Sequence, residues 1–137
     1  MSYGVSVALQ EAVYRRLLDD PAVSGLVGAG VYDALPDGPV PETYVSLGPE
    51  DVRDRSDAEG AGALHRFTVS VISEARGFAA AKTVAGAVGD ALLHGELALT
   101  RGRLVGLWFE RASARRSGRA GQVRRIDLRF RARVEDN

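Results

Sequence analysis

The sequence predicts an α+β fold in which an antiparallel β-sheet carries two main helices on one face. Two segments, residues 5–18 and 78–93, repeat apolar side chains at helical spacing. Residues 64–73 and 125–134 alternate apolar and polar side chains, as half-buried strands do. The order along the chain is helix, three strands, helix and a final β-meander, which suits one sheet with helices on a single face. With 137 residues and 45% hydrophobic residues the chain has enough apolar mass for one core, so we expect a single domain over residues 1–137.

The first third of the sequence predicts two helices and two strands. Apolar residues recur at helical spacing over residues 5–18, and Asp20-Pro21 ends this helix because the residue before a proline disfavours the helical conformation. Pro21 can open a short helix that continues to residue 27. Residues 31–34 form a brief strand, residues 35–41 a loop with three prolines, and residues 43–47 another strand.

The middle of the sequence predicts a mobile, acidic loop followed by a strand and the second main helix. Residues 49–63 contain a single bulky aliphatic side chain, Val52, so this segment cannot bury enough apolar surface to order itself. We expect it to be disordered in a lone subunit and ordered by a partner; the alternative is a solvated loop that never becomes ordered. Its acidic residues are Glu50, Asp51, Asp54, Asp57 and Glu59. The strand over residues 64–73 follows, and His94-Gly95 ends the helix over residues 78–93.

The last third of the sequence predicts a long hairpin over residues 103–134. A short strand at 97–99 and a turn at 100–103 lead into a strand at 104–113, and a basic loop at 114–121 connects it to the final strand. The final strand alternates without interruption. The residues expected to face the helices are Ile126, Leu128, Phe130, Ala132 and Val134, and the arginines expected on the opposite face are Arg125, Arg129, Arg131 and Arg133.

No motif in the sequence predicts catalysis, a cofactor or a metal ion. The chain has no cysteine, which excludes disulfides, thiolate metal sites and a nucleophilic thiol. Residues 25–30 read G-x-x-G-x-G without a preceding strand or a following Lys-Ser/Thr, so they fit neither a dinucleotide fold nor a P-loop. His65 and His94 lack metal-ligand spacing, and no G-x-S-x-G motif is present. We therefore predict a protein that is not an enzyme, with no cofactor and no metal.

Charge is distributed unevenly along the chain although its net value is zero. Residues 1–63 carry a net charge of −7 and residues 64–137 a net charge of +7, and all but one of the eighteen basic residues are arginine. Two interpretations of the arginine content stay open: a GC-rich genome, or use of guanidinium groups at interfaces, where they pair with carboxylate or phosphate in bidentate geometry. Opposite halves of this kind favour contacts between one side of a subunit and the other side of the next.

Several segments, taken in order, resemble the tail-completion family, which includes the tail-terminator proteins of long-tailed phages and of gene transfer agents. The N-terminal helix over residues 9–17, the segments 26–28 and 31–36, and the strand Pro41-Glu-Thr-Tyr44-Val-Ser-Leu-Gly48 match its opening. The strand at 65–71, the helix at 80–92 and the closing strand at 128–134 match its second half. One departure is Ile72-Ser73, where an aromatic residue is expected. The resemblance covers nearly the whole chain.

The resemblance implies a ring, usually a hexamer, at the head-proximal end of a tail tube. Such a ring halts tube polymerisation and joins tail to neck, and its partners are the tail tube protein, neck proteins and the double-stranded DNA in its lumen. We expect no membrane partner, because the sequence has no signal peptide and no apolar run of membrane-spanning length. We therefore expect assembly in the bacterial cytoplasm and a final place in a phage-like particle.

Within this ring we assign two groups of residues to partner contacts. The acidic loop residues named above are expected to meet a neighbouring subunit or tail protein. The arginines expected at a subunit interface or at the lumen are Arg115, Arg116, Arg119, Arg125, Arg129, Arg131 and Arg133. An alternative function is an arginine-rich nucleic-acid-binding module that uses Arg115, Arg116, Arg119, Arg124 and Arg125. A third is a small enzyme with an acidic site in the loop, which would need a bound metal or a perturbed carboxylate.

Overall fold

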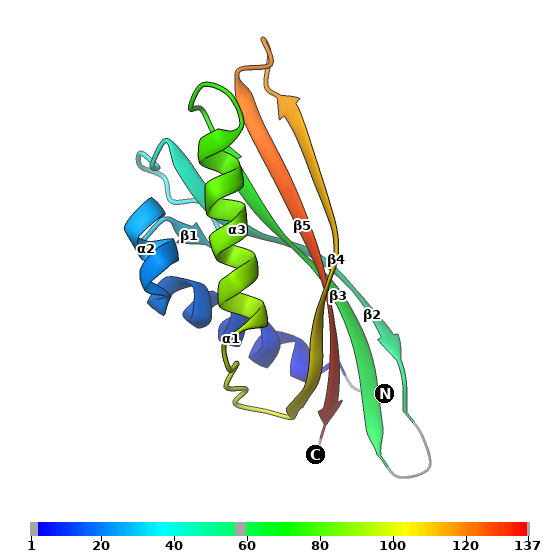
Figure 1. The fold of residues 1–137 in the computed structure, drawn as a ribbon. Helices are drawn as coiled ribbons and strands as arrows, with labels where there is room; N and C mark the ends of the chain where they lie inside the picture. Colours follow the sequence, from blue (N-terminus) through cyan, green and yellow to red (C-terminus); the bar gives the residue numbers. More distant parts are fainter. Residues whose placement is uncertain (1–2, 57–59, 137) are drawn as a thin grey trace.

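The computed structural model describes residues 3–56 and 60–136, and within them three helices lie on one face of a five-stranded sheet (Figure 1). The helices are α1 (Val5–Asp19), α2 (Pro21–Val27) and α3 (Ala79–Leu93). The strands are β1 (Val31–Tyr32), β2 (Thr43–Asp54), β3 (Ala61–Ser73), β4 (Arg103–Ser117) and β5 (Val123–Asp136). Their order across the sheet is β1-β2-β3-β5-β4. The predicted α+β class is confirmed.

The boundary between the first two helices has the local chemistry that the sequence indicates. Asp20 takes an extended backbone conformation, and its carboxylate accepts a hydrogen bond of 3.0 Å from the amide of Val23. Pro21 occupies the first turn of α2, where its missing N–H group costs no helical hydrogen bond. The chain therefore leaves α1 and starts α2 within a single residue.

The sheet is antiparallel except at one edge. Strands β2, β3, β5 and β4 pair antiparallel, whereas β1 pairs parallel to β2 through Val31 and Tyr32. Ten residues connect β1 to β2, which is enough for the chain to return to the starting end of β1 before it enters β2. The expectation of a purely antiparallel sheet is therefore corrected at this short strand.

Within the predicted loop over residues 49–63, residues 49–54 and 61–63 lie in strands instead. Strand β2 continues to Asp54 and β3 begins at Ala61, with Glu50 opposite Phe67 and Asp54 opposite Ala63. Main-chain hydrogen bonds between strands do not depend on apolar side chains, so β3, which is held on its other side by β5, can template this polar extension. Val52 also packs on a small cluster around Val5, Ala63 and Val134. The expectations for Asp57 and Glu59 lie outside the described residues.

Two further predicted boundaries are wrong. Strand β4 runs to Ser117, so the turn of the β4–β5 hairpin is confined to residues 118–122, where Gly118 and Gly121 have positive φ angles of 85° and 65°. Residues 97–99 form no strand in the structure, and Leu97 and Leu99 instead pack against the core from an irregular connection. Leu97 and Leu99 are two residues apart, which is the spacing of inward-facing residues on a strand. An irregular segment that buries two such side chains has the same sequence pattern.

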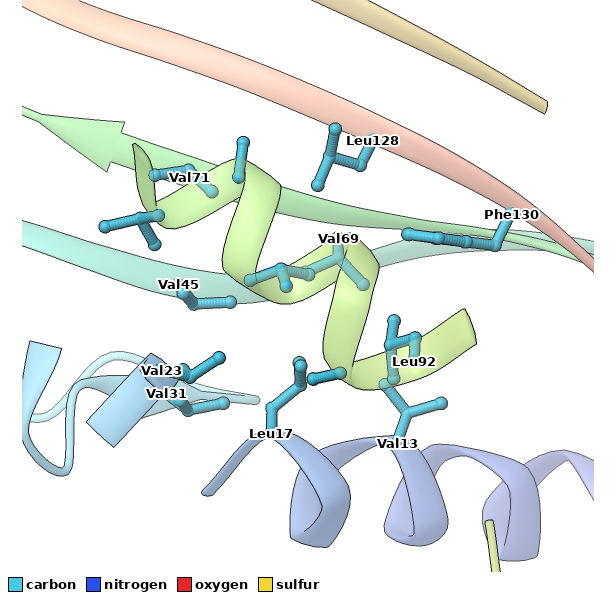
Figure 2. Close-up of a cluster of buried hydrophobic side chains, with 14 of the residues drawn as sticks. Val13, Leu17, Val23, Val31, Val45, Val69, Val71, Leu92, Leu128 and Phe130 are labelled. Carbon is cyan, nitrogen blue, oxygen red and sulfur yellow. The ribbon is translucent and has the colours of Figure 1, made fainter. Parts of the chain in front are cut away.

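The core lies between the helices and the inner face of the sheet (Figure 2). Val13 and Leu17 of α1, Leu92 of α3 and Val69 and Phe130 of the sheet converge there. The predicted inward residues of β5 are all at most 5% exposed, which confirms that register: Ile126, Leu128, Phe130, Ala132 and Val134. The predicted hairpin over residues 103–134 is also confirmed.

The two long hairpins turn at opposite ends of the sheet. Ala61, at the β2–β3 turn, pairs with Asp136, whereas Ser73 pairs with Arg124, next to the β4–β5 turn. In Figure 1 the β4–β5 hairpin rises beyond the helices at one end and the β2–β3 hairpin extends beyond them at the other. The first carries six arginines and no acid over residues 111–125, whereas the second carries Glu50, Asp51 and Asp54 together with Arg53 and Arg55. The end of the β4–β5 hairpin is thus strongly basic, and the β2–β3 hairpin has mixed charge.

Candidate assembly surfaces

The outer face of the sheet, opposite the helices, is the first candidate surface. Because side chains alternate along a strand, burying the even-numbered residues of β5 places its odd-numbered residues on this face. The same pairing brings residues of β3 and β4 beside them: Thr68 and Arg111 flank Arg129, and Trp108 lies opposite Arg131. We call this surface the outer arginine face: Arg66, Arg111, Arg115, Arg125, Arg129, Arg131 and Arg133, with the acids Glu110 and Asp127 among them.

Asp127 compensates part of this charge from within the arginine row itself. Its carboxylate lies 3.0 Å from the guanidinium groups of both Arg125 and Arg115 and accepts a hydrogen bond of 2.6 Å from the Ser70 hydroxyl. Partial burial raises the pKa of Asp127, but the Ser70 hydrogen bond and the two guanidinium charges outweigh burial and lower that pKa below its ordinary value. Asp127 is therefore an anion at neutral pH and holds two arginines in place.

Glu110 and Trp108 engage the next arginines of the row. Glu110 occupies a bulge of β4 between Phe109 and Arg111, and its carboxylate lies 3.1 Å from Arg66 and 3.4 Å from Arg129. The guanidinium of Arg131 stacks 5.1 Å from the centre of the Trp108 ring. Sequence reasoning missed these partners. The sequence places Asp127 on the same strand face as the arginines of β5, whereas Glu110 comes close to these arginines only because β4 has a bulge.

The outer arginine face still carries a strong excess of positive charge after these contacts, with seven arginines to two acids. A shallow depression of about 250 Å³ in its centre is lined by Arg111, Arg115, Arg125 and Arg129 together with Asp127. Two other predicted residues lie beyond it at the end of the hairpin: Arg116 on β4 and Arg119 in the turn. Within the described residues, the side chains of Arg111, Arg116 and Arg119 have no hydrogen-bond or ion-pair partner. This excess charge is available to an anionic partner.

The predicted acidic residues lie on strand β2 rather than in a loop. Asp51 lies 3.9 Å from Arg53, and Asp54 accepts a hydrogen bond of 3.0 Å from the Ser56 amide at the start of the turn. Within the described part of the chain, no group of three or more potential ligands is arranged to hold a metal ion. Asp51 is the cross-strand partner of Arg66, so the acidic stretch of β2 borders the outer arginine face where β2 pairs with β3.

Glu50 joins α1 to the buried interior of the sheet. Its carboxylate accepts hydrogen bonds from the hydroxyls of Tyr3 and Ser6, and its other oxygen lies 3.4 Å from Nδ1 of the fully buried His65. Burial raises the pKa of Glu50, but these hydrogen bonds and His65 together lower that pKa below its ordinary value. Glu50 is thus an anion at neutral pH. No pattern in the sequence indicates this cluster, whose members extend from Tyr3 to His65 along the chain.

A groove of about 720 Å³ lies between α1 and the middle of β2. Tyr3, Ser6, Val7 and Gln10 line one wall, and the opposite wall and floor are formed by Leu47, Gly48, Pro49, Glu50, Phe67 and Thr68. Tyr3 and Val7 are 60% and 64% exposed, so apolar surface is open to solvent at the rim. This groove is the second candidate surface.

Comparison with protein families identifies the group to which the molecule is related. The model of the family described as "Tail completion protein gp17" matches residues 11–135. The chain belongs to this tail completion family. It is therefore a structural protein of phage-type tails. A search of curated proteins gave no significant match.

Comparison with solved structures gives a close structural relative. A chain in a structure described as "Virion of native gene transfer agent (GTA) particle" is 61% identical in sequence, with a TM-score of 0.92. The match covers 98% of this chain and 99% of that chain. Among the described residues, no helix has both the length and the apolar character required to cross a membrane.

Proposed function

We propose that the chain forms a ring at the head-proximal end of a phage-like tail tube, where it halts tube polymerisation and joins tail to neck. The observation that carries this proposal is the likeness to a gene transfer agent virion chain over nearly the full length of both chains. At 61% identity and a TM-score of 0.92, the two chains have the same fold. Membership in the tail completion family supports the same role.

The surfaces described above supply a physical basis for ring closure. A ring needs a heterologous contact, in which one side of each subunit meets a different side of the next. Strand β2, with three acids and one arginine, and strand β4, with four arginines and one glutamate, lie toward opposite edges of the sheet, which favours such a contact and disfavours contact between like surfaces. The ring is expected to contain six copies and to bind the tail tube protein on one side and neck proteins on the other.

The outer arginine face is proposed to meet either a neighbouring subunit or the DNA that passes through the lumen. Its excess of arginines over acids and its central depression with four arginines fit the planar anions that guanidinium groups bind, carboxylate or phosphate. This depression also supports the second candidate function, a nucleic-acid-binding module. Assembly would take place in the bacterial cytoplasm, followed by incorporation into a phage-like particle.

Electron microscopy of the purified protein, alone and with its neighbouring tail proteins, tests the ring directly. Rings with a central hole are expected, and monodisperse single subunits under both conditions would contradict the proposal. Raising the salt concentration distinguishes the ring from the nucleic-acid-binding module. The affinity for phosphate falls steeply with the logarithm of salt concentration, whereas a packed ring persists. Tight DNA binding by single subunits at low salt, with no rings, would favour the nucleic-acid-binding module.

A further inference from the structure

Strand β4 forms an open edge of the sheet with apolar side chains on both of its faces. It pairs with β5 on one side, and among the described residues no strand pairs with its other side. Val105, Trp108 and Phe109 are 44%, 44% and 50% exposed on this edge. An open edge with large apolar side chains is prone to pair with another chain, so proteins in solution usually cover or interrupt such edges. The edge of β4 therefore has the properties of a surface that is covered by a partner.

The opposite side of the sheet presents a second open edge beside the α1–β2 groove. Strand β1 pairs with β2 only through Val45 and Ser46, so β2 is unpaired on that side from Leu47 onward, within the described residues. The groove borders this stretch and exposes Val7 and Tyr3 at its rim. It offers main-chain groups and an apolar recess at the same place. These are the two features that peptide recognition by strand addition uses.

The charges along the two edges are complementary. Strand β4 carries four arginines and one glutamate, whereas β2 carries three acids and one arginine. Glu50 lines the groove itself and is anionic at neutral pH, and Asp51 and Asp54 continue the negative charge along β2. With the two strands antiparallel and Val105 beside Glu50, Arg103 of β4 comes beside Asp51 and Val52. Contact between the two edges would therefore place a basic side chain beside an acidic one and cover apolar surface on both sides.

We propose that β4 of one copy docks in the α1–β2 groove of the next copy, alongside the open edge of β2. This assignment rests on the proposed ring and specifies its subunit contact. Because strand directions alternate from β2 to β4, the incoming β4 runs antiparallel to β2, and the sheet continues from copy to copy. The contact joins two different edges of the same chain. Repeating it therefore produces a closed ring or a filament and never an isolated pair.

Bulges limit how much of this contact consists of strand pairing. Strand β4 is irregular at Leu104/Gly106 and at Phe109/Arg111, and β2 is irregular at Leu47/Glu50. Bulges of this kind interrupt ladder pairing at sheet edges. Side chains such as Val105 and Phe109 must then supply much of the contact, which makes docking selective for the groove over any other exposed edge.

Disulfide trapping tests the docking. Because the natural chain has no cysteine, only the introduced cysteines can form disulfides. We would introduce Val7→Cys and Val105→Cys together and oxidise the purified protein and the assembled particles. A ladder of cross-linked subunits that ends at one closed ring is expected. The matched control combines Val7→Cys with Leu26→Cys, because Leu26 on α2 is 45% exposed and Val105 is 44% exposed. This control should give no more than the pairs formed by either single cysteine variant.

Charge variants give an independent measure of the same contact. Val7→Arg places a positive charge in the apolar groove close to Arg103 of the incoming β4, and Val105→Asp places a negative charge close to Glu50 and Asp51. Each variant alone should remain monomeric with the circular dichroism spectrum of the natural chain. A mixture retains one intact junction between unlike subunits, so native mass spectrometry should detect dimers or larger complexes only in the mixture.

Failure of the docking and failure of the ring can be told apart. Rings that form without Val7–Val105 cross-links, and that form equally well from Val7→Arg, would overturn the docking while leaving the ring intact. Single subunits of the natural chain, both in solution and with tail proteins, would overturn the proposed function. A mixture of the two charge variants that stays monomeric would show that the two surfaces do not contact one another.

Discussion

Phe130 is the side chain on which the register of the sheet can be tested most sharply. It is fully buried, its ring stacks on Phe67 with centroids 5.6 Å apart, and Phe109 meets it edge-on at 5.9 Å. Replacing a buried phenylalanine by alanine costs about 3–5 kcal/mol. Two ring pairs are lost at once, each worth about 0.5–1.5 kcal/mol beyond burial, so we expect Phe130→Ala to cost about 4–5 kcal/mol.

Thermal unfolding followed by circular dichroism would measure this cost. Unfolding entropies of about 2.1 cal/mol/K per residue convert 4–5 kcal/mol into a drop in Tm of roughly 14–17 °C for a chain of this length. Phe109→Ala is the matched control, because it removes a ring that is 50% exposed and should cost about 1–2 kcal/mol. A Phe130→Ala variant with a Tm within about 3 °C of the natural chain, or one less affected than Phe109→Ala, would refute the register.

Further predictions concern the charged surfaces. Replacing Arg129 and Arg131 together by glutamate should abolish ring assembly or tail joining while circular dichroism shows an intact fold. Normal assembly of this variant would show that the outer arginine face is exposed to solvent and binds no partner. Asp127 has a lowered pKa in the folded chain, so its contribution to stability is present above its ordinary pKa and is lost as the pH falls through the lowered value. Asp127→Asn should therefore lower the free energy of unfolding at pH 7 and weaken its decline below about pH 4 in urea titrations; an unchanged pH profile would show that the contacts of Asp127 do not stabilise the fold. Amides along the open edges of β2 and β4 should gain protection from hydrogen exchange when subunits assemble, and equal exchange in both states would argue against the docking of these edges.

The sequence was most informative where one face of an element is buried. The final strand alternates between apolar residues and arginines because the helices cover its inner face and solvent or a partner meets the other, so its register could be predicted residue by residue. The helices over residues 5–18 and 78–93 were predictable for the same reason. Their apolar stripes meet the core.

Prediction from sequence was poor where main-chain pairing alone holds a segment. Glu50 to Asp54 have the composition of a loop, yet they form a strand because β3 supplies a ladder for them. Polar side chains on a hairpin that extends past the core carry no periodic signal. The partners of the arginine row were hidden for a related reason, since Glu110 reaches Arg66 and Arg129 from a bulge that only the pairing of β4 with β5 creates.

The groove between α1 and β2 could not be found from sequence at all. Its walls come from segments about forty residues apart, and the hydrogen bonds of Tyr3 and Ser6 to Glu50 exist only after α1 has packed beside β2. Long-range placement of this kind depends on the topology of the whole sheet. The proposed docking of β4 therefore emerges from the structure and not from any motif.

The proposed function requires that this chain stops tail-tube growth by binding one end of the tube. Electron microscopy of tail tubes assembled from the tube protein, with and without the purified chain, would show whether it does. We expect a ring at one end of each tube and no further elongation of ring-bearing ends when more tube protein is added. Tubes that keep bare ends and elongate equally in the presence and absence of the chain would contradict it.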